Sequence, residues 1–173
     1  ELDGDVYTYH INGNILNISR YKNGIKNGTY VEFYSNNDVK KILTYKNDKF
    51  NGSYSTYFRG KKPNIFCKYL NGKLDGEYIV YNKHGAILKT INFKKGCKHG
   101  KETDFFLNGV IKSVVNYKNN IKEGTFTKYF NNGSIYYKLN IINDIFYGYY
   151  KEYYKNGVLK TCLYKSLYTS LRF

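Results

Sequence analysis

The residue types that most often carry out chemistry in proteins are few and widely spaced in this chain. Its three histidines, His10, His84 and His99, lie far apart in the sequence, near segments rich in glycine and asparagine. Neither a His-x-x-x-His pair nor a Gly-x-Ser-x-Gly segment occurs, although zinc hydrolases and serine hydrolases depend on such spacings. An active site needs different side chains that converge on one point. We therefore expect no catalytic residue, no metal ligand and no cofactor, and we expect that the protein is not an enzyme.

The cysteines also show no pattern of a chemical site. Cys67, Cys97 and Cys162 have neither the paired spacing of zinc ligands nor the even number of a disulfide framework. Cys67 falls in a column of the repeat described below that otherwise holds mainly Leu, Ile and Val, so we expect a small buried side chain there. Free thiols favour a reducing compartment, intracellular or within a larger assembly, while the absence of an initiating Met keeps a secreted form open.

The chain is strongly basic. It has 28 Lys and Arg against 13 Asp and Glu, which gives a formal net charge of +15. Such a charge suits an anionic partner such as nucleic acid or an acidic membrane. The lysines are spread singly along the chain, however, so a solvated, solubilising surface explains them more simply. No apolar stretch reaches the roughly 20 residues that a transmembrane helix needs, and we expect none.

A repeat that fills the chain positions these scattered residues. A glycine recurs every 24 residues, and we number the positions of each copy from this glycine as zero. A fixed period of this kind identifies a repeat array. We predict one repeat domain over residues 1–173, in which the first and last copies act as caps. The seven copies begin at Gly4, Gly28, Gly52, Gly76, Gly100, Gly124 and Gly148.

Each copy contains two turn signals. Position 9 is Gly in five copies, usually after Asn, and position 20 is Gly, Asp or Asn in six copies, again usually after Asn. Asn-Gly between alternating segments favours a type I′ turn with a two-residue loop, because both loop residues need a positive φ. The spacing of the turns leaves strands of about six to eight residues and no room for helices. We predict an all-β fold, a single-layer, elongated antiparallel meander of about seven stacked β-hairpins.

Pairing across the turns predicts two unlike faces. A two-residue loop at positions 8 and 9 places position 2 opposite position 15, and position 6 opposite position 11. Tyr30 would then face Leu43, and Tyr34 would face Val39, as aromatic–aliphatic pairs that stabilise antiparallel strands. The opening glycine would lie opposite position 15 of the preceding copy and leave room for neighbouring rings. We call this aromatic and aliphatic side the carpet face.

The other face is predicted to carry one row of aromatic residues among polar ones. Position 5 is Tyr or Phe in every copy, whereas its neighbours on that face include Thr103, Thr127 and Lys151. The row either stiffens the sheet, because Tyr and Phe favour strands, or forms a contact surface. We take six of its members as candidate partner-binding residues and call them the ridge: Phe33, Tyr57, Tyr81, Phe105, Tyr129 and Tyr153.

Two segments of the repeat, residues 21–28 (YKNGIKNG) and 93–100 (FKKGCKHG), resemble the heart of a MORN (membrane occupation and recognition nexus) repeat. That family repeats aromatic-x-x-Gly-x-x-x-Gly. The period of 24 residues, and the Tyr or Phe two residues after the second glycine, look like the variant MORN repeats of antitoxin-like bacterial proteins and of large DNA viruses. The resemblance implies a ribbon of hairpins that docks protein segments along a groove, or that binds acidic phospholipids.

Three functions are open. The favoured one is a non-enzymatic structural or protein-interaction module, whose aromatic faces are covered by a partner chain or by a second copy of this chain. The alternative is peripheral binding to acidic membrane lipids through the lysines, which salt would weaken. Nucleic-acid binding is disfavoured, because the aromatic residues are shared between two faces and follow no track of lysines.

Overall fold

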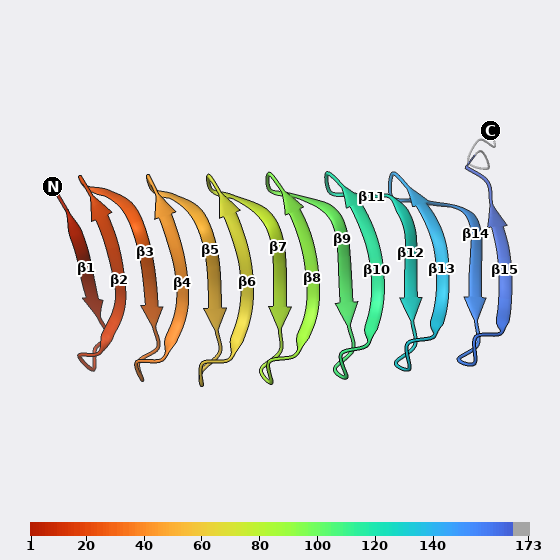
Figure 1. Cartoon of the computed structure of the whole chain (residues 1–173), viewed down its shortest axis with the longest axis horizontal. Helices are drawn as coiled ribbons and strands as arrows, with labels where there is room; N and C mark the ends of the chain where they lie inside the picture. Colours follow the sequence, from red (N-terminus) through yellow and green to blue (C-terminus); the bar gives the residue numbers. More distant parts are fainter. Residues whose placement is uncertain (168–173) are drawn as a thin grey trace. The chain divides into compact units, whose positions relative to one another are not determined.

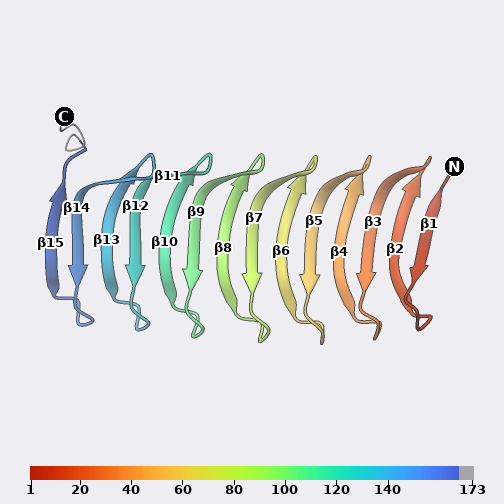
Figure 2. The same ribbon diagram turned by 180° about the vertical axis from the view of Figure 1, so that it is seen from behind.

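The computed structural model describes residues 1–167, and β-strands are the regular elements found there, without a helix. Within each of the two parts of the chain described below, the strands follow one another in chain order in both views (Figures 1 and 2). The predicted all-β fold is confirmed. The strands are β1 (Gly4–Tyr9), β2 (Ile15–Lys22), β3 (Ile25–Phe33), β4 (Val39–Lys46), β5 (Lys49–Tyr57), β6 (Pro63–Leu70), β7 (Lys73–Tyr81), β8 (Ile87–Lys94), β9 (Cys97–Phe105), β10 (Ile111–Lys118), β11 (Ile121–Lys122), β12 (Gly124–Tyr129), β13 (Ile135–Ile142), β14 (Ile145–Tyr153) and β15 (Leu159–Lys165).

The chain divides into two compact units, and each is a single-layer antiparallel meander. The first unit comprises residues 1–86 and 93–96 and contains β1 to β7. The second comprises residues 87–92 and the chain from residue 97 onward, and it contains β9 to β15. Within each unit the strands pair antiparallel in chain order, and the short β11 pairs with β10 beside β12. Alternating strands and tight turns predict this arrangement.

The turn at positions 19 and 20 contains the left-handed residues that the sequence predicts. Asn47 and Asp48, for example, have φ values of 50° and 60°, which is type I′ geometry. The Asp48 carboxylate also accepts a hydrogen bond of 2.8 Å from the backbone N–H of Lys26, which lies in β3 just after the preceding turn of this kind. Asn and Asp suit this place because their short side chains tolerate left-handed backbone and bond to nearby peptide groups.

The turn near position 9 differs from the two-residue loop predicted for it. Between β3 and β4, the N–H of Tyr34 donates to the carbonyl of Asp38, and the N–H of Asn37 donates to the carbonyl of Tyr34, at 2.8 and 2.9 Å. The loop therefore has three residues, and of these only Asn37 has a positive φ, of 65°. The prediction of a two-residue loop was wrong because a residue that tolerates left-handed backbone also suits the third place of a three-residue loop.

This loop shifts the register of the strand that follows it. Phe33 faces Val39, and Lys40 forms a bulge. The predicted register resumes at Glu32 and Lys41, and it includes the pair of Tyr30 and Leu43. The same shift occurs in the hairpins β1–β2, β5–β6, β9–β10, β12–β13 and β14–β15. Because directly opposed residues share a face, position 11 lies on the ridge face, which reverses the prediction for it. The bulge residue Lys40, at position 12, reaches Glu32 on the carpet face.

The opening glycine was predicted to leave room for neighbouring rings, but in the structure its role is to adopt a backbone conformation with a positive φ. Gly28 has a φ of 121°, and a Cβ atom there would lie 2.9 Å from Cδ of Arg20. The irregular pairing around it places Ser19 opposite Tyr30 of the next copy instead of opposite the glycine. The predicted packing role was wrong, because the positive φ by itself requires glycine at this place.

The buried apolar side chains all lie in one column, at position 15. Its buried members are Ser19, Leu43, Cys67, Ile91 and Val115. In the first unit, Leu43 pairs with Tyr30 on one side and with Tyr54 on the other. In a sheet of one layer, a side chain escapes solvent only where larger side chains flank it on both neighbouring strands. The prediction that Cys67 is a small buried side chain is confirmed, since it is 1% exposed.

Candidate interaction faces

Each ridge residue is the last residue of its strand. The first unit carries Phe33, Tyr57 and Tyr81, at the ends of β3, β5 and β7, and the second carries Phe105, Tyr129 and Tyr153, at the ends of β9, β12 and β14. All six are half-buried. Because they occupy the same place in successive copies, they form a row of three on one face of each unit. The structure thus brings the predicted site residues together within each unit.

An aliphatic row accompanies the ridge, in contrast to the prediction of polar neighbours. The position 11 residues lie directly opposite the ridge residues, in the pairs Phe33–Val39, Tyr57–Pro63, Phe105–Ile111, Tyr129–Ile135 and Tyr153–Leu159. Ile111 and Leu159 remain 39% and 49% exposed. The face therefore carries an apolar strip two side chains wide. The sequence could not show this, because the strip depends on the bulge after the three-residue loop.

The two units differ in what lies beside this strip. In the first unit, positions 3 and 14 form pairs such as Val31–Ile42 and Ser55–Phe66, which extend the apolar surface. In the second unit, the same positions hold the pairs Thr103–Val114, Thr127–Lys138 and Lys151–Cys162. The polar neighbours predicted for the ridge, Thr103, Thr127 and Lys151, are thus found beside it in the second unit.

Hydrogen bonds between successive loops hold the strand ends in place. The Tyr34 hydroxyl donates to the carbonyl of Tyr57 at 2.8 Å, and Nε2 of His10 lies 3.1 Å from the carbonyl oxygen of Phe33. Asn108 Nδ2, at position 8, donates to the carbonyl of Asn131 in the next loop at 3.0 Å. Side chains of one copy therefore fix the backbone on which the next ridge residue stands.

The carpet face of the first unit is a network of rings. Phe50 contacts Tyr45, Tyr54 and Tyr69, with ring centroids 5.1 to 6.4 Å apart. Burial raises the pKa of the Cys67 thiol beneath these rings to about 11. At this pKa the thiol is protonated near neutral pH, and since the thiolate is the reactive form, Cys67 is an inert packing residue.

Acidic residues on this face are tied to lysines. Glu32, at position 4, accepts hydrogen bonds from Lys40 at 2.5 Å and from Lys41 at 2.7 Å. Burial acts to raise the pKa of Glu32, but the two lysines outweigh it and lower the pKa. Burial, and secondarily the Glu32 charge, raises the pKa of Tyr30 to about 12. The carboxylate is therefore a charge partner for the bulge lysine and its neighbour.

Sequence reasoning missed one residue of the carpet face, Glu102. It stands at position 2, where five other copies have an aromatic ring, and it is 7% exposed. It accepts hydrogen bonds from Lys89 at 2.8 Å and from Lys98 at 2.6 Å. Burial opposes its ionisation, yet the two lysines prevail and lower its pKa. A carboxylate in a column that is aromatic in five other copies, after a copy that supplies lysines at positions 13 and 22, is the sequence signal that could have revealed this cluster.

The histidines lie in three different copies, His10 and His84 at the loops near position 9 and His99 in β9, and they take part in local hydrogen bonds. Nδ1 of His99 lies 3.3 Å from Oδ1 of Asn119, and the backbone N–H of His84 donates to the Asn82 side chain at 2.8 Å. Within residues 1–167, no group of three or more His, Cys, Asp and Glu side chains has a geometry that could hold a metal ion. Over the same residues, no helix is long and apolar enough to cross a membrane.

Comparison with known protein families identifies the repeat. The family described as MORN repeat variant matches five segments, residues 2–23, 26–47, 98–119, 122–143 and 146–166. They cover more than half of the chain, and the first four end on the first residue of a type I′ turn. The resemblance seen in the sequence is thereby confirmed. No curated protein matches the chain.

Proposed function

Because the chain belongs to the MORN repeat variant family, we propose that it is a non-enzymatic interaction module that binds a partner protein chain along its ridge face. Repeats of this family generally serve protein or membrane interactions. In this proposal the seven copies act together as one binding module. The six ridge residues, with the aliphatic residues opposite them, form the contact surface.

One observation carries this proposal: the apolar strip of the ridge face is fully formed and partly open to solvent. Tyr and Phe are enriched in protein interfaces, where each provides a large contact area at a small cost in side-chain entropy. The ridge residues are half-buried by their own neighbours, so their orientation is fixed before a partner arrives. In each unit, a row of three aromatic residues at the same place in successive copies suits an extended partner chain.

The test compares two triple variants in the second unit. In the first, Phe105, Tyr129 and Tyr153 are changed to Ser on the ridge face. In the matched control, their chain neighbours on the carpet face, Phe106→Ser, Phe130→Ser and Tyr154→Ser, lose the same kind of side chain in the same copies. Circular dichroism checks that both variants keep their β-structure.

Tagged wild-type and variant proteins are then used to capture partners from the native source at low and at high salt. We expect a protein that is retained at high salt, lost with the ridge variant and kept with the control. Equal retention by both variants would contradict the proposal. Capture of anionic vesicles, abolished by salt, would favour the lipid alternative instead.

A further inference from the structure

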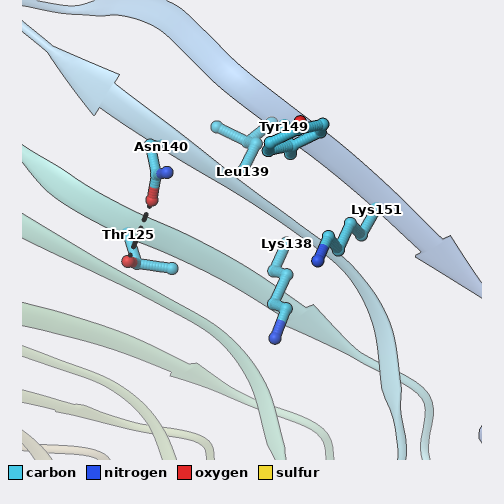
Figure 3. A pocket seen from close by; sticks show the side chains of 6 residues that line it. All are labelled: Thr125, Lys138, Leu139, Asn140, Tyr149 and Lys151. Atoms are coloured by element: carbon cyan, nitrogen blue, oxygen red, sulfur yellow. Dashed lines mark hydrogen bonds between the residues drawn. The ribbon is translucent and has the colours of Figure 1, made fainter. Parts of the chain in front are cut away.

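We propose that the second unit carries a binding site for a phosphate group, built by Lys138 and Lys151 on the ridge face. The two lysines are not ridge residues themselves, and they lie beside the apolar strip on the same face of this unit. It lies on β12, β13 and β14 (Figure 3).

The first observation is a pair of like charges. Lys138 and Lys151 are directly opposite each other on β13 and β14. Like charges in this arrangement destabilise a sheet, because their side chains project side by side from the same face. The other strands beside them offer Thr127 and Cys162, which carry no negative charge to compensate. An anion bound between the two ammonium groups would remove the repulsion.

The second observation is where the acidic residues of this unit are placed. Its ion pairs join Lys89, Lys98 and Lys160 to Glu102, Asp104 and Glu152. These pairs lie at positions of the carpet face. Among residues 1–167, no carboxylate lies within ion-pair distance of Lys138 or Lys151. The nearest carboxylate along the chain, that of Glu152, points to the other face and is bonded to Lys160 at 2.8 Å.

The third observation is a cavity beside the lysines. It has a volume of about 290 Å³ and is lined by Thr125, Lys138, Leu139, Asn140, Tyr149 and Lys151. Thr125 donates a hydrogen bond of 3.2 Å to Oδ1 of Asn140, as drawn in Figure 3, and this contact leaves the Asn140 amide N–H groups as donors. The lining therefore offers two ammonium groups, an amide and a phenol, and no carboxylate.

Aromatic rings limit where the ammonium groups can move. Nζ of Lys151 lies 5.6 Å from the ring centroid of Tyr149, and Nζ of Lys138 lies 6.0 Å from that of Tyr153. Cation–π contacts of this length hold a charge in place without neutralising it. Tyr149 also contacts Tyr164, with centroids 5.0 Å apart, and both rings are more than half exposed. Two charges match a phosphate dianion, and the exposed rings suit an aromatic phosphate ester.

The site can be tested by NMR titration of the full chain with sodium phosphate against sodium chloride at equal ionic strength. We expect saturable shifts that are confined to the residues lining the cavity. Lys138→Gln and Lys151→Gln should each weaken binding by about tenfold, since each removes one charge-assisted hydrogen bond. Lys112→Gln is the matched control, because it removes the same charge from the carpet face of this unit, and it should leave binding unchanged.

Phenyl phosphate serves as a second probe. If it binds more tightly than inorganic phosphate, and Tyr149→Leu removes the difference, the rings form part of the site. Equal binding of the two probes supports a site for the phosphate group alone. The proposal is overturned if phosphate causes no saturable shifts beyond those of chloride, or if Lys112→Gln weakens binding as much as Lys138→Gln does.

Discussion

At the scale of single residues, Glu102 shows how a charge can replace a ring in the carpet. Its side chain is 9% exposed, and those of its partners Lys89 and Lys98 are 35% and 32% exposed. A carboxylate this deep is stable only with its partners, because loss of one partner leaves an uncompensated charge. The cluster replaces the ring contacts that position 2 makes in other copies with ionic ones.

We predict that Glu102→Gln destabilises the protein by about 1–3 kcal/mol in urea unfolding at pH 7, because two partly buried lysines lose their counter-charge. The pKa of Glu102 is lowered from its ordinary value of 4.5, so the ionised group stabilises the folded state above that pH, and this stabilisation is lost as the pH falls through the lowered pKa. The difference between variant and wild type should therefore shrink in acid. Glu152→Gln, which removes a carboxylate paired with one lysine instead of two, should have a smaller effect at pH 7.

A second prediction concerns Tyr30, whose pKa is raised to about 12 by burial and by Glu32. A raised pKa means that the neutral phenol stabilises the folded state below pH 10, and this stabilisation is lost as the pH rises from 10 towards 12. Tyr30→Phe should therefore lose less stability than the wild type over this range. Denaturant unfolding at a series of alkaline pH values measures this, and equal losses in both proteins would contradict it.

At the scale of the elements, the two turns of each copy show what sequence can and cannot predict. Strand positions, the pairing of positions 2 and 15 and the turn at Asn47-Asp48 follow from periodicity and turn chemistry. The loop before Val39 does not, because the same residue types satisfy loops of two and of three residues. Loop length decides on which face position 11 lies. The aromatic row of the apolar strip, at position 5, could therefore be predicted from the sequence. The aliphatic row, at position 11, could not.

We predict that Gly28→Ala destabilises the protein by about 1–3 kcal/mol, because of its φ of 121° and the contact of the new Cβ with Arg20. Arg20→Ala in the same chain should recover only part of the loss, since it removes the contact and leaves the backbone strain. Thermal unfolding of the two variants and of Arg20→Ala alone measures both contributions. Full recovery in the double variant would show that φ is unimportant at this place.

At the scale of the whole molecule, stability depends on a thin core. Without a second layer, burial is concentrated in one column of position 15, and its value depends on both neighbouring strands. Leu43 is 3% exposed between Tyr30 and Tyr54, whereas Leu163, at the same position in the last copy, is 60% exposed. The same residue type at the same position of the repeat thus has very different surroundings.

We predict that Leu43→Ala costs about 2–4 kcal/mol of unfolding free energy, the usual loss for a buried leucine. Leu163→Ala is the matched control, and its cost should stay below about 1 kcal/mol, as for other exposed substitutions. Chemical denaturation of both variants provides the comparison. Similar losses would mean that the column is not the main source of stability.

The bonds between loops have a consequence for how such a gene can change. Asn108 reaches the carbonyl of Asn131, and Asp48 reaches the N–H of Lys26, so each copy is tied to its neighbour at a fixed place of the repeat. Recombination that duplicates or deletes one complete copy leaves equivalent partners at the junction. Loss of a single codon shifts every side chain that follows within the copy to the opposite face. Inheritance in whole copies is therefore the tolerated route by which the array changes length.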